Sequence, residues 1–408
     1  MTSYAPSSSL GWLDLDVSAS ERVATMLRAL DEPGTLDVLG LGTIRDAFSE
    51  LLAPGTSTIQ TRLRYFLFLP WIFQQLAADV VDPGSAAERL RDREKLLIAR
   101  LVHLGPNQGV IGFNARERLK RMPSEAYWGG LGSWGIRRFD LTISEYARYT
   151  VTASARRPDR DDDGNVTHKD PSPWAQLPEA PDVFMIEDAD FDLTTAEAEF
   201  LLDHVRQRHP DSLIARYAGS GVDVNVDYPW NLPRGPATPR LLEVLRHAEN
   251  FSELTTGPQY VYNLLLAREA QKQLGRNTDQ LIDAQNELLQ DWADAIAQRG
   301  DELAEWVDNL DELWSMVGGD EIHPRTKEFV GDMLRRGITN PSGLANDSVV
   351  AKRVVEREFH LKGKRARLAN RSALENWNGA PFGGPFVYRW GTVVSYLTDL
   401  NDAIVEMA

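Results

Sequence analysis

The chain has 408 residues, of which 42% are hydrophobic and 25% charged, and its formal net charge is −16. This length exceeds the range over which one core keeps growing, so we expect two or three packed units with the composition of a folded globular protein. Because the chain has no cysteine, disulfides, cysteine-ligated zinc, iron–sulfur clusters and thiol catalysis are excluded.

The charge is unevenly distributed along the chain. Residues 278–321 hold 13 acidic groups and one basic group, a net of −12, whereas residues 86–160 hold 15 basic and 8 acidic groups, a net of +7. The overall charge argues against nonspecific coating of nucleic acid, which depends on Lys and Arg. The local excess in 86–160 still permits a confined nucleic-acid contact.

The N-terminal region, residues 1–154, is predicted to be a helical domain that contains six or seven helices punctuated by Pro and Gly. The apolar run at 63–81 is interrupted by Pro70 and by polar residues, so it predicts a buried core helix rather than a membrane span. Arg62 and Arg64 flank this run, and we expect both to have buried or interfacial polar partners. The first residues lack the features of a secretion signal, which predicts a cytoplasmic protein.

The segment 109–150 has the order of a small DNA-binding unit. A basic helix is followed by a capped aromatic helix and then by an arginine pair, as in helix-turn-helix or winged-helix-like units. The predicted phosphate contacts are Arg116, Arg118, Lys120, Arg121, Arg137 and Arg138. The alternative is a packed helix pair with solvated arginines.

The middle region, residues 155–239, is predicted to be irregular. The tract 155–182 is rich in Pro, Gly and Asp and predicts a linker or exposed loop, and 222–226 has room for one short strand. Between them, 193–208 predicts a helix that starts near Thr194 and is capped by a solvated acidic loop.

The C-terminal region, residues 240–408, is predicted to be a second helical domain that ends in a helix at 388–407. Within 278–321 an acidic face lies opposite an apolar stripe, which indicates an antiparallel helical hairpin that turns at Arg299-Gly300. The stripe consists of Leu281, Leu288, Trp292, Ile296, Leu303, Trp306, Leu310 and Leu313. We expect the acidic face to be exposed.

A second basic run lies at 352–371, with eight basic and two acidic residues. Its candidate site residues are Lys362, Lys364, Arg365, Arg367 and Arg371. Phosphate is one candidate ligand for this run. The alternative is that the run packs beside the acidic hairpin within the chain.

No motif assigns a catalytic residue, a metal or a cofactor. The seven histidines form no metal-binding pattern. His204 and His209 are five residues apart and lie on different helix faces, so surface or capping roles are expected. The glycine groups lack the strand–turn–helix setting of phosphate-binding loops.

Several phrases of the sequence carry a family resemblance. They are GWLDLD at 11–16, TIQTRLRYFLFLPWIF at 58–73, GVIG at 109–112, PSEAYWGGLGSWGI at 123–136, HAENFSELTTGPQYVYNLLLA at 247–267, RLANRSALENWNG at 367–379 and YRW at 388–390. Together they resemble a bacterial family of large helical proteins catalogued as a domain of unknown function. The resemblance implies gene neighbourhoods of anti-phage defence, with helicases, nucleases or phospholipase D-like proteins nearby, and implies no catalytic residues.

The sequence therefore predicts a mainly α-helical protein of two or three units. We expect a non-enzymatic binding or scaffolding component of a DNA-directed, anti-phage defence-type complex, with a helicase or nuclease as protein partner, a possible nucleic-acid contact and no membrane association. The alternative is a metal-dependent hydrolase or nuclease whose site is assembled from residues distant in sequence.

Overall fold

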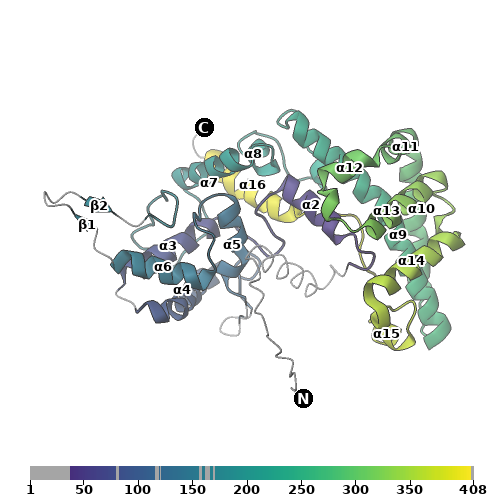
Figure 1. The fold of residues 1–408 in the computed structure, drawn as a ribbon, viewed down its shortest axis with the longest axis horizontal. Coiled ribbons are helices and arrows are strands. Elements are labelled where there is room, and N and C mark those ends of the chain that lie inside the picture. Colours follow the sequence, from purple (N-terminus) through teal and green to yellow (C-terminus); the bar gives the residue numbers. More distant parts are fainter. Residues whose placement is uncertain are drawn as a thin grey trace, which may run out of the picture. The chain divides into compact units, whose positions relative to one another are not determined.

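The computed structural model describes residues 37–79, 82–114, 119, 121–155, 159–160, 166–168 and 171–405. The fold is mainly α-helical, as the sequence predicts (Figure 1). The α-helices are α2 (Gly42–Leu52), α3 (Tyr65–Ala78), α4 (Ala86–Leu101), α5 (Pro123–Ser133), α6 (Ile143–Ala155), α7 (Thr195–Arg208), α8 (Leu213–Tyr217), α9 (Pro239–Leu274), α10 (Asp279–Gln298), α11 (Gly300–Asp308), α12 (Leu310–Met316), α13 (Pro324–Thr339), α14 (Ser348–Lys362), α15 (Arg371–Glu375) and α16 (Trp390–Val405).

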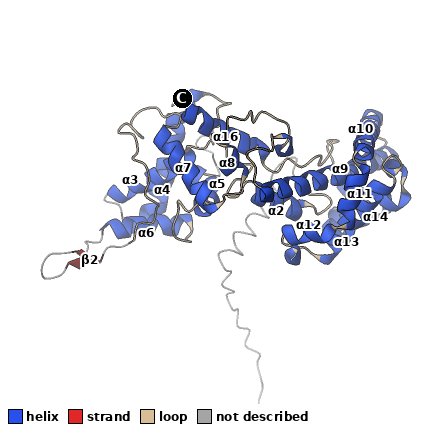
Figure 2. Cartoon of the chain, turned by 90° about the horizontal axis from the view of Figure 1, so that it is seen from above, coloured by secondary structure: helices blue, strands red, loops and turns tan. Residues whose placement is uncertain are grey.

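Short 3-10 helices connect several of these elements. They are η1 (Pro83–Ser85), η2 (Val102–Leu104), η4 (Pro229–Asn231), η5 (Gly319–Glu321), η6 (Leu344–Asn346) and η7 (Gly363–Arg365). Loops join most of the α-helices, as Figure 2 shows. None of the described helices combines the length and hydropathy that a membrane crossing needs.

The described residues form two compact units. Unit 1 contains 37–42, Glu253–Leu310 and Ile322–Pro385. Unit 2 contains Thr43–Ser252, Asp311–Glu321 and 386–405. This division differs from the three regions 1–154, 155–239 and 240–408 expected from composition, because packing rather than chain order defines a unit.

The core of unit 2 is built around α3, which contacts α4, α5 and α6. Residues 65–73 of this helix are all buried, so the prediction of a buried core helix is confirmed. Phe66 stacks on Trp134 with ring centroids 4.0 Å apart. A side chain at Gly130 would meet Phe66 and the carbonyl oxygen of Gly55, so only glycine permits this approach of α5 to α3.

The last helix, α16, belongs to unit 2 because it packs on α7 and α8. Its Asp399 is buried and accepts hydrogen bonds from the backbone N–H of Leu63, at 2.8 Å, and from the guanidinium of Arg62. Arg64, on the other side of Leu63, pairs with Asp190 and with the buried Glu197. The prediction that both arginines have polar partners is therefore confirmed.

The start of α7 agrees with its sequence signal. Thr194 is the N-cap, and Glu197 completes a capping box by returning a hydrogen bond to the Thr194 N–H. The acidic residues before it are exposed, as expected. These are Asp182, Glu187, Asp188, Asp190 and Asp192.

Of the expectations for the middle region, the exposed loop holds only in part and the short strand is wrong. Part of the tract 155–182 is not a free linker, because Trp174 is buried against Phe73 and Tyr146 and its neighbours bond to the segment after α5. No strand forms at 222–226; the carbonyl of Val226 instead accepts a hydrogen bond from the Trp390 indole. The short antiparallel pair β1 (Asp159–Arg160) and β2 (Val166–His168) was not predicted.

Unit 1 packs α10, α11, α13 and α14 with the second part of α9. Trp292 of α10 occupies a space left by two glycines, Gly257 of α9 and Gly337 of α13, and its indole N–H donates to the carbonyl of Glu253 at 2.7 Å. The predicted turn at Arg299-Gly300 is the boundary between α10 and α11. Most of the predicted stripe is buried, but Leu288 is exposed and Leu281 half-buried.

Candidate nucleic-acid interface

The predicted phosphate contacts of the first basic segment have different environments. Arg116, Arg118 and Lys120 lie outside the described residues. Arg121 is half-buried and Arg138 is exposed.

Arg137 is buried and has a structural role. Its guanidinium donates to the carbonyls of Phe139 and Leu141, the latter at 3.4 Å, and lies over the Trp128 ring at 4.9 Å from the centroid. These contacts fix the turn after α5. Among the described candidates of this segment, Arg138 is the one whose side chain is open to a ligand.

Helix α5 does not resemble an exposed recognition helix. Most of its residues are buried, and other elements cap both of its ends. The carboxylate of Glu94 accepts from the Ser124 N–H at 2.7 Å at the N-terminus. At the C-terminus, imidazole nitrogens of His204 and His209 lie 2.9 and 3.0 Å from the last carbonyls, which confirms capping roles for both. The helix-turn-helix interpretation therefore does not fit α5.

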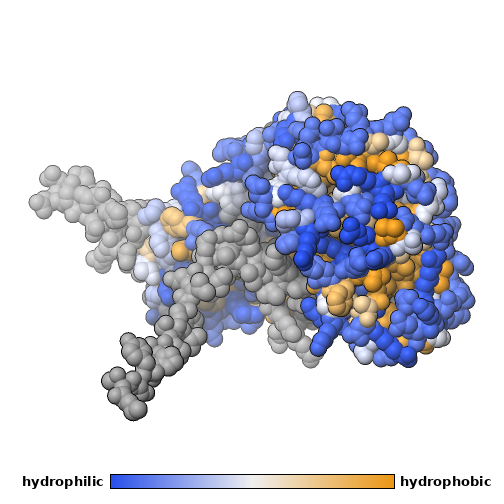
Figure 3. All heavy atoms as spheres, turned by 45° about the vertical axis from the view of Figure 1, so that its right-hand side comes forward, coloured by the Kyte–Doolittle hydropathy of each residue, from blue (hydrophilic) through white to orange (hydrophobic). Residues whose placement is uncertain are grey.

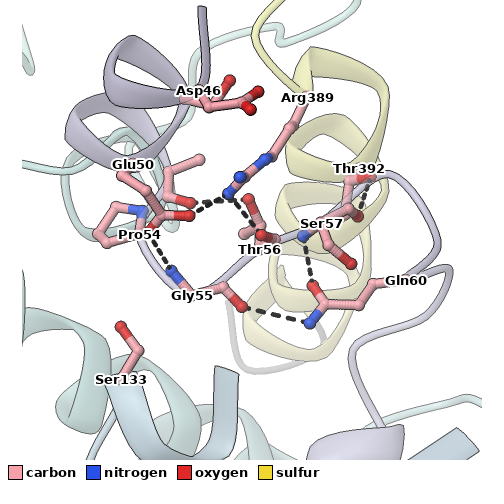
Figure 4. Close-up of polar contacts among 12 residues, drawn as sticks. Asp46, Glu50, Pro54, Gly55, Thr56, Ser57, Gln60, Ser133, Arg389 and Thr392 are labelled. Carbon is pink, nitrogen blue, oxygen red and sulfur yellow. Dashed lines mark hydrogen bonds and ion pairs between the residues drawn. The ribbon is translucent and has the colours of Figure 1, made fainter. Parts of the chain in front are cut away.

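The motif segments of unit 2 meet around the loop that follows α2. Figure 4 shows Arg389 reaching Glu50 and the carbonyl of Thr56, while Gln60 bonds to Gly55 and Ser57. Arg389 has a φ of 62°, which non-glycine residues rarely adopt. Its side-chain contacts are intramolecular, so we interpret this cluster as structural.

The second basic run divides into buried and exposed members. Lys362 pairs with Glu358 and is only 13% exposed, and burial lowers its pKa although Glu358 opposes that effect. Arg367 lies over the Phe382 ring at 4.7 Å. Arg371 pairs with Glu375 on the surface. Lys362 and Arg367 are therefore held by their own unit.

Lys364 and Arg365 have a different environment. Both are exposed, and no carboxylate of the described chain lies within ion-pair distance of either. They follow α14 directly, in η7. Their charges are thus available to an external anion.

A further cation, a histidine and an aromatic ring extend this surface. Arg325, at the start of α13, is exposed, and its guanidinium lies 3.1 Å from Nε2 of His360, near the end of α14. Phe359, the residue before His360, is 55% exposed. Figure 3 shows hydrophobic patches set among hydrophilic residues on the surface of the molecule. We call the set Arg325, Phe359, His360, Lys364 and Arg365 the α14-end surface.

A buried carboxylate holds the α14-end surface in place. Glu358 is fully buried and accepts from the Tyr262 hydroxyl at 2.6 Å and from the Leu368 N–H at 2.9 Å. The second bond ties the chain after η7 back to α14. The side-chain amide of Asn370 adds a bond to the carbonyl of Lys364. The basic turn is therefore fixed before any ligand arrives.

The acidic face of α10 and α11 is exposed, as predicted. None of its carboxylates pairs with the basic run 352–371 within the described residues. The expected intramolecular match between acidic hairpin and basic run is therefore not formed. Arg353 of the run pairs instead with Glu328 and Asp332 of α13, and Lys364 and Arg365 remain open to an external ligand.

Sequence reasoning named Lys364 and Arg365 but missed Phe359, His360 and Arg325. The ring of Phe359 had a sequence signal, since helical spacing places it opposite the apolar positions Val350 and Val354. Arg325 had none, because only the packing of α13 on α14 brings it close.

No group of three or more His, Asp or Glu side chains that could hold a metal ion occurs in the described part of the chain. The fold and surface define a mainly α-helical, two-unit protein with an exposed cationic and aromatic surface. The chain belongs to the family of unknown function DUF6361, whose family model matches residues 7–404. Comparison with curated proteins gives no match, and comparison with solved structures gives none either.

Proposed function

We propose that this protein is a non-enzymatic binding component that contacts nucleic acid through the α14-end surface. One observation carries the proposal: Lys364 and Arg365 are exposed cations without carboxylate partners in the described chain, next to the Arg325–His360 pair. Exposed cations of this kind bind phosphates and release counterions from the nucleic acid.

The rest of the chain restricts where binding can occur. The protein carries a net charge of −16, and the acidic face of α10 and α11 lies in the same unit as the α14-end surface. Such a face repels phosphate. Binding is therefore expected at a small surface, with an affinity that depends on few contacts.

The test is binding of the full chain to labelled oligonucleotides, measured by fluorescence anisotropy. The double variant Lys364→Glu with Arg365→Glu should strongly weaken binding at low salt. The matched control is Lys272→Glu, which reverses an exposed charge of α9 in the same unit. Equal binding by the wild type and both variants would overturn the proposal.

The first basic segment is a second part of the proposal. Among the described candidates of this segment, Arg138 is the exposed one. The loss of oligonucleotide affinity in Arg138→Glu, measured in the same assay, gives the contribution of this residue. Arg121, Arg116, Arg118 and Lys120 are proposed contacts of the same segment on sequence alone.

The cellular context is proposed from the motif resemblance. The resemblance supports a bacterial, anti-phage defence-type complex with a helicase or nuclease as partner, and we propose a cytoplasmic location for it. The competing function is a metal-dependent hydrolase or nuclease, and degradation of the same oligonucleotides with added Mg²⁺ or Mn²⁺ would favour it.

A further inference from the structure

The end of α14 presents an aromatic ring to solvent, just before the turn that holds Lys364 and Arg365. Phe359 is 55% exposed, whereas the buried face of the same helix carries Val350, Val354 and Glu358. At 100° per residue, Phe359 lies about 140° or more from the first two positions. The ring thus points away from the core of unit 1, where it can stack on a flat partner.

The backbone places this ring next to the basic turn. Gly363 has a φ of 53°, and its N–H donates to the carbonyl of Phe359. This glycine, with its positive φ, ends the helix, and the chain passes directly into Lys364 and Arg365. The bond from the Leu368 N–H to Glu358 then fixes the turn.

We infer that the α14-end surface selects single-stranded nucleic acid, with one base stacked on Phe359 and the flanking phosphates on Arg325, Lys364 and Arg365. The inference rests on the proposed function and names its substrate class. A base inside a duplex has both faces covered by neighbouring bases, so the Phe359 ring cannot stack on it. An unpaired base has a free face and can stack on the ring. A duplex would use the cations alone.

A membrane is the competing ligand of a surface that combines cations with an exposed aromatic ring. The local charges disfavour it. Glu356 on α14 and Glu328 on α13 are both exposed on the same two helices, where they pair with Lys352 and Arg353, and a broad anionic plane would approach these carboxylates as well. A narrow strand can contact the cations and the ring without covering the acidic side chains.

The experiment measures binding of the full chain to three probes at low salt. They are an oligothymidine of about 20 nucleotides, a duplex of about the same length and vesicles that contain phosphatidylglycerol. We expect the wild type to prefer the single strand. Phe359→Ala should weaken single-strand binding about tenfold or more and leave duplex binding unchanged, because stacking is lost and the cations stay.

Two variants act as controls. Phe359→Trp should restore single-strand binding, since a larger ring stacks at least as well. Val349→Ala, at an exposed apolar position of the same helix, should have no effect. Rescue by Trp shows that the effect of Phe359→Ala is not general unfolding.

The outcomes separate the two proposals. Equal affinity for single strand and duplex with no effect of Phe359→Ala would overturn strand selection and leave nucleic-acid binding in place. No binding to either nucleic acid would overturn both proposals, and so would binding to the vesicles alone.

Discussion

At the residue scale, one buried carboxylate should control how stability changes with pH. Glu94 is 2% exposed, and burial raises its pKa from 4.5 to about 7. The folded protein therefore binds this proton more tightly than the unfolded chain. Its contribution is fully present below pH 4.5 and is lost as the pH rises to about 7, a change of about 3 kcal/mol.

Glu94→Gln removes this titration while keeping an acceptor for the Ser124 N–H. The free energy of unfolding of wild type minus variant should fall by about 3 kcal/mol between pH 4.5 and pH 7. Urea unfolding at several pH values measures it. A difference that stays constant across this range would show that Glu94 does not titrate as described.

His247 should act in the opposite direction. Its side chain is fully buried, and burial, with the nearby Arg246, lowers its pKa from 6.5 to about 4. The folded protein keeps it neutral, so its contribution is present above pH 6.5 and is lost as the pH falls toward 4. In His247→Gln, the loss of unfolding free energy between pH 6.5 and pH 4 should be smaller than in the wild type by about 3 kcal/mol. Urea unfolding at several pH values measures this loss. An equal loss in variant and wild type would contradict the prediction.

At the element scale, Glu358 links stability to the proposed interface. Glu358→Ala leaves the Tyr262 hydroxyl and the Leu368 N–H without this acceptor, which should lower the free energy of unfolding by about 3 kcal/mol. It should also weaken oligonucleotide binding, because the turn that carries Lys364 loses its tether. Val349→Ala, an exposed change on the same helix, is the control, and equal behaviour of both variants would refute the tether.

The helical elements were largely predictable from the sequence. The apolar run of α3 and the capping signals of α7 have local causes, so they appear in the pattern itself. The apolar stripe of 278–321 was ambiguous where two leucines are adjacent. Leu288 was predicted to belong to the buried stripe, but Leu289 is buried and Leu288 is exposed. The buried position of Trp174 was not predictable, because Phe73 and Tyr146, which cover it, are far away in sequence.

The candidate site was predictable in part. Charge counting found the run 352–371, but it could not separate Lys364 from Lys362, which the buried Glu358 retains. It also named Arg137, which binds backbone carbonyls instead. Net charge records how many cations a segment has, whereas burial and partners decide which of them remain available.

At the scale of the whole molecule, the protein is acidic and carries a small cationic surface. The exposed carboxylates of α10 and α11 keep phosphate away from their own face and oppose nonspecific binding. Affinity for nucleic acid should therefore come from few contacts and depend on salt in proportion to their number. If the protein instead bound through many dispersed cations, replacing Lys364 and Arg365 would change its affinity little.

The most direct test is the slope of log binding constant against log salt concentration for single-stranded DNA, measured by anisotropy between about 50 and 200 mM salt. Three phosphate contacts, from Arg325, Lys364 and Arg365, predict a slope of about −2, and Lys364→Glu with Arg365→Glu should reduce it toward zero with loss of affinity. A slope near zero in the wild type, or one that the double variant leaves unchanged, would contradict the account.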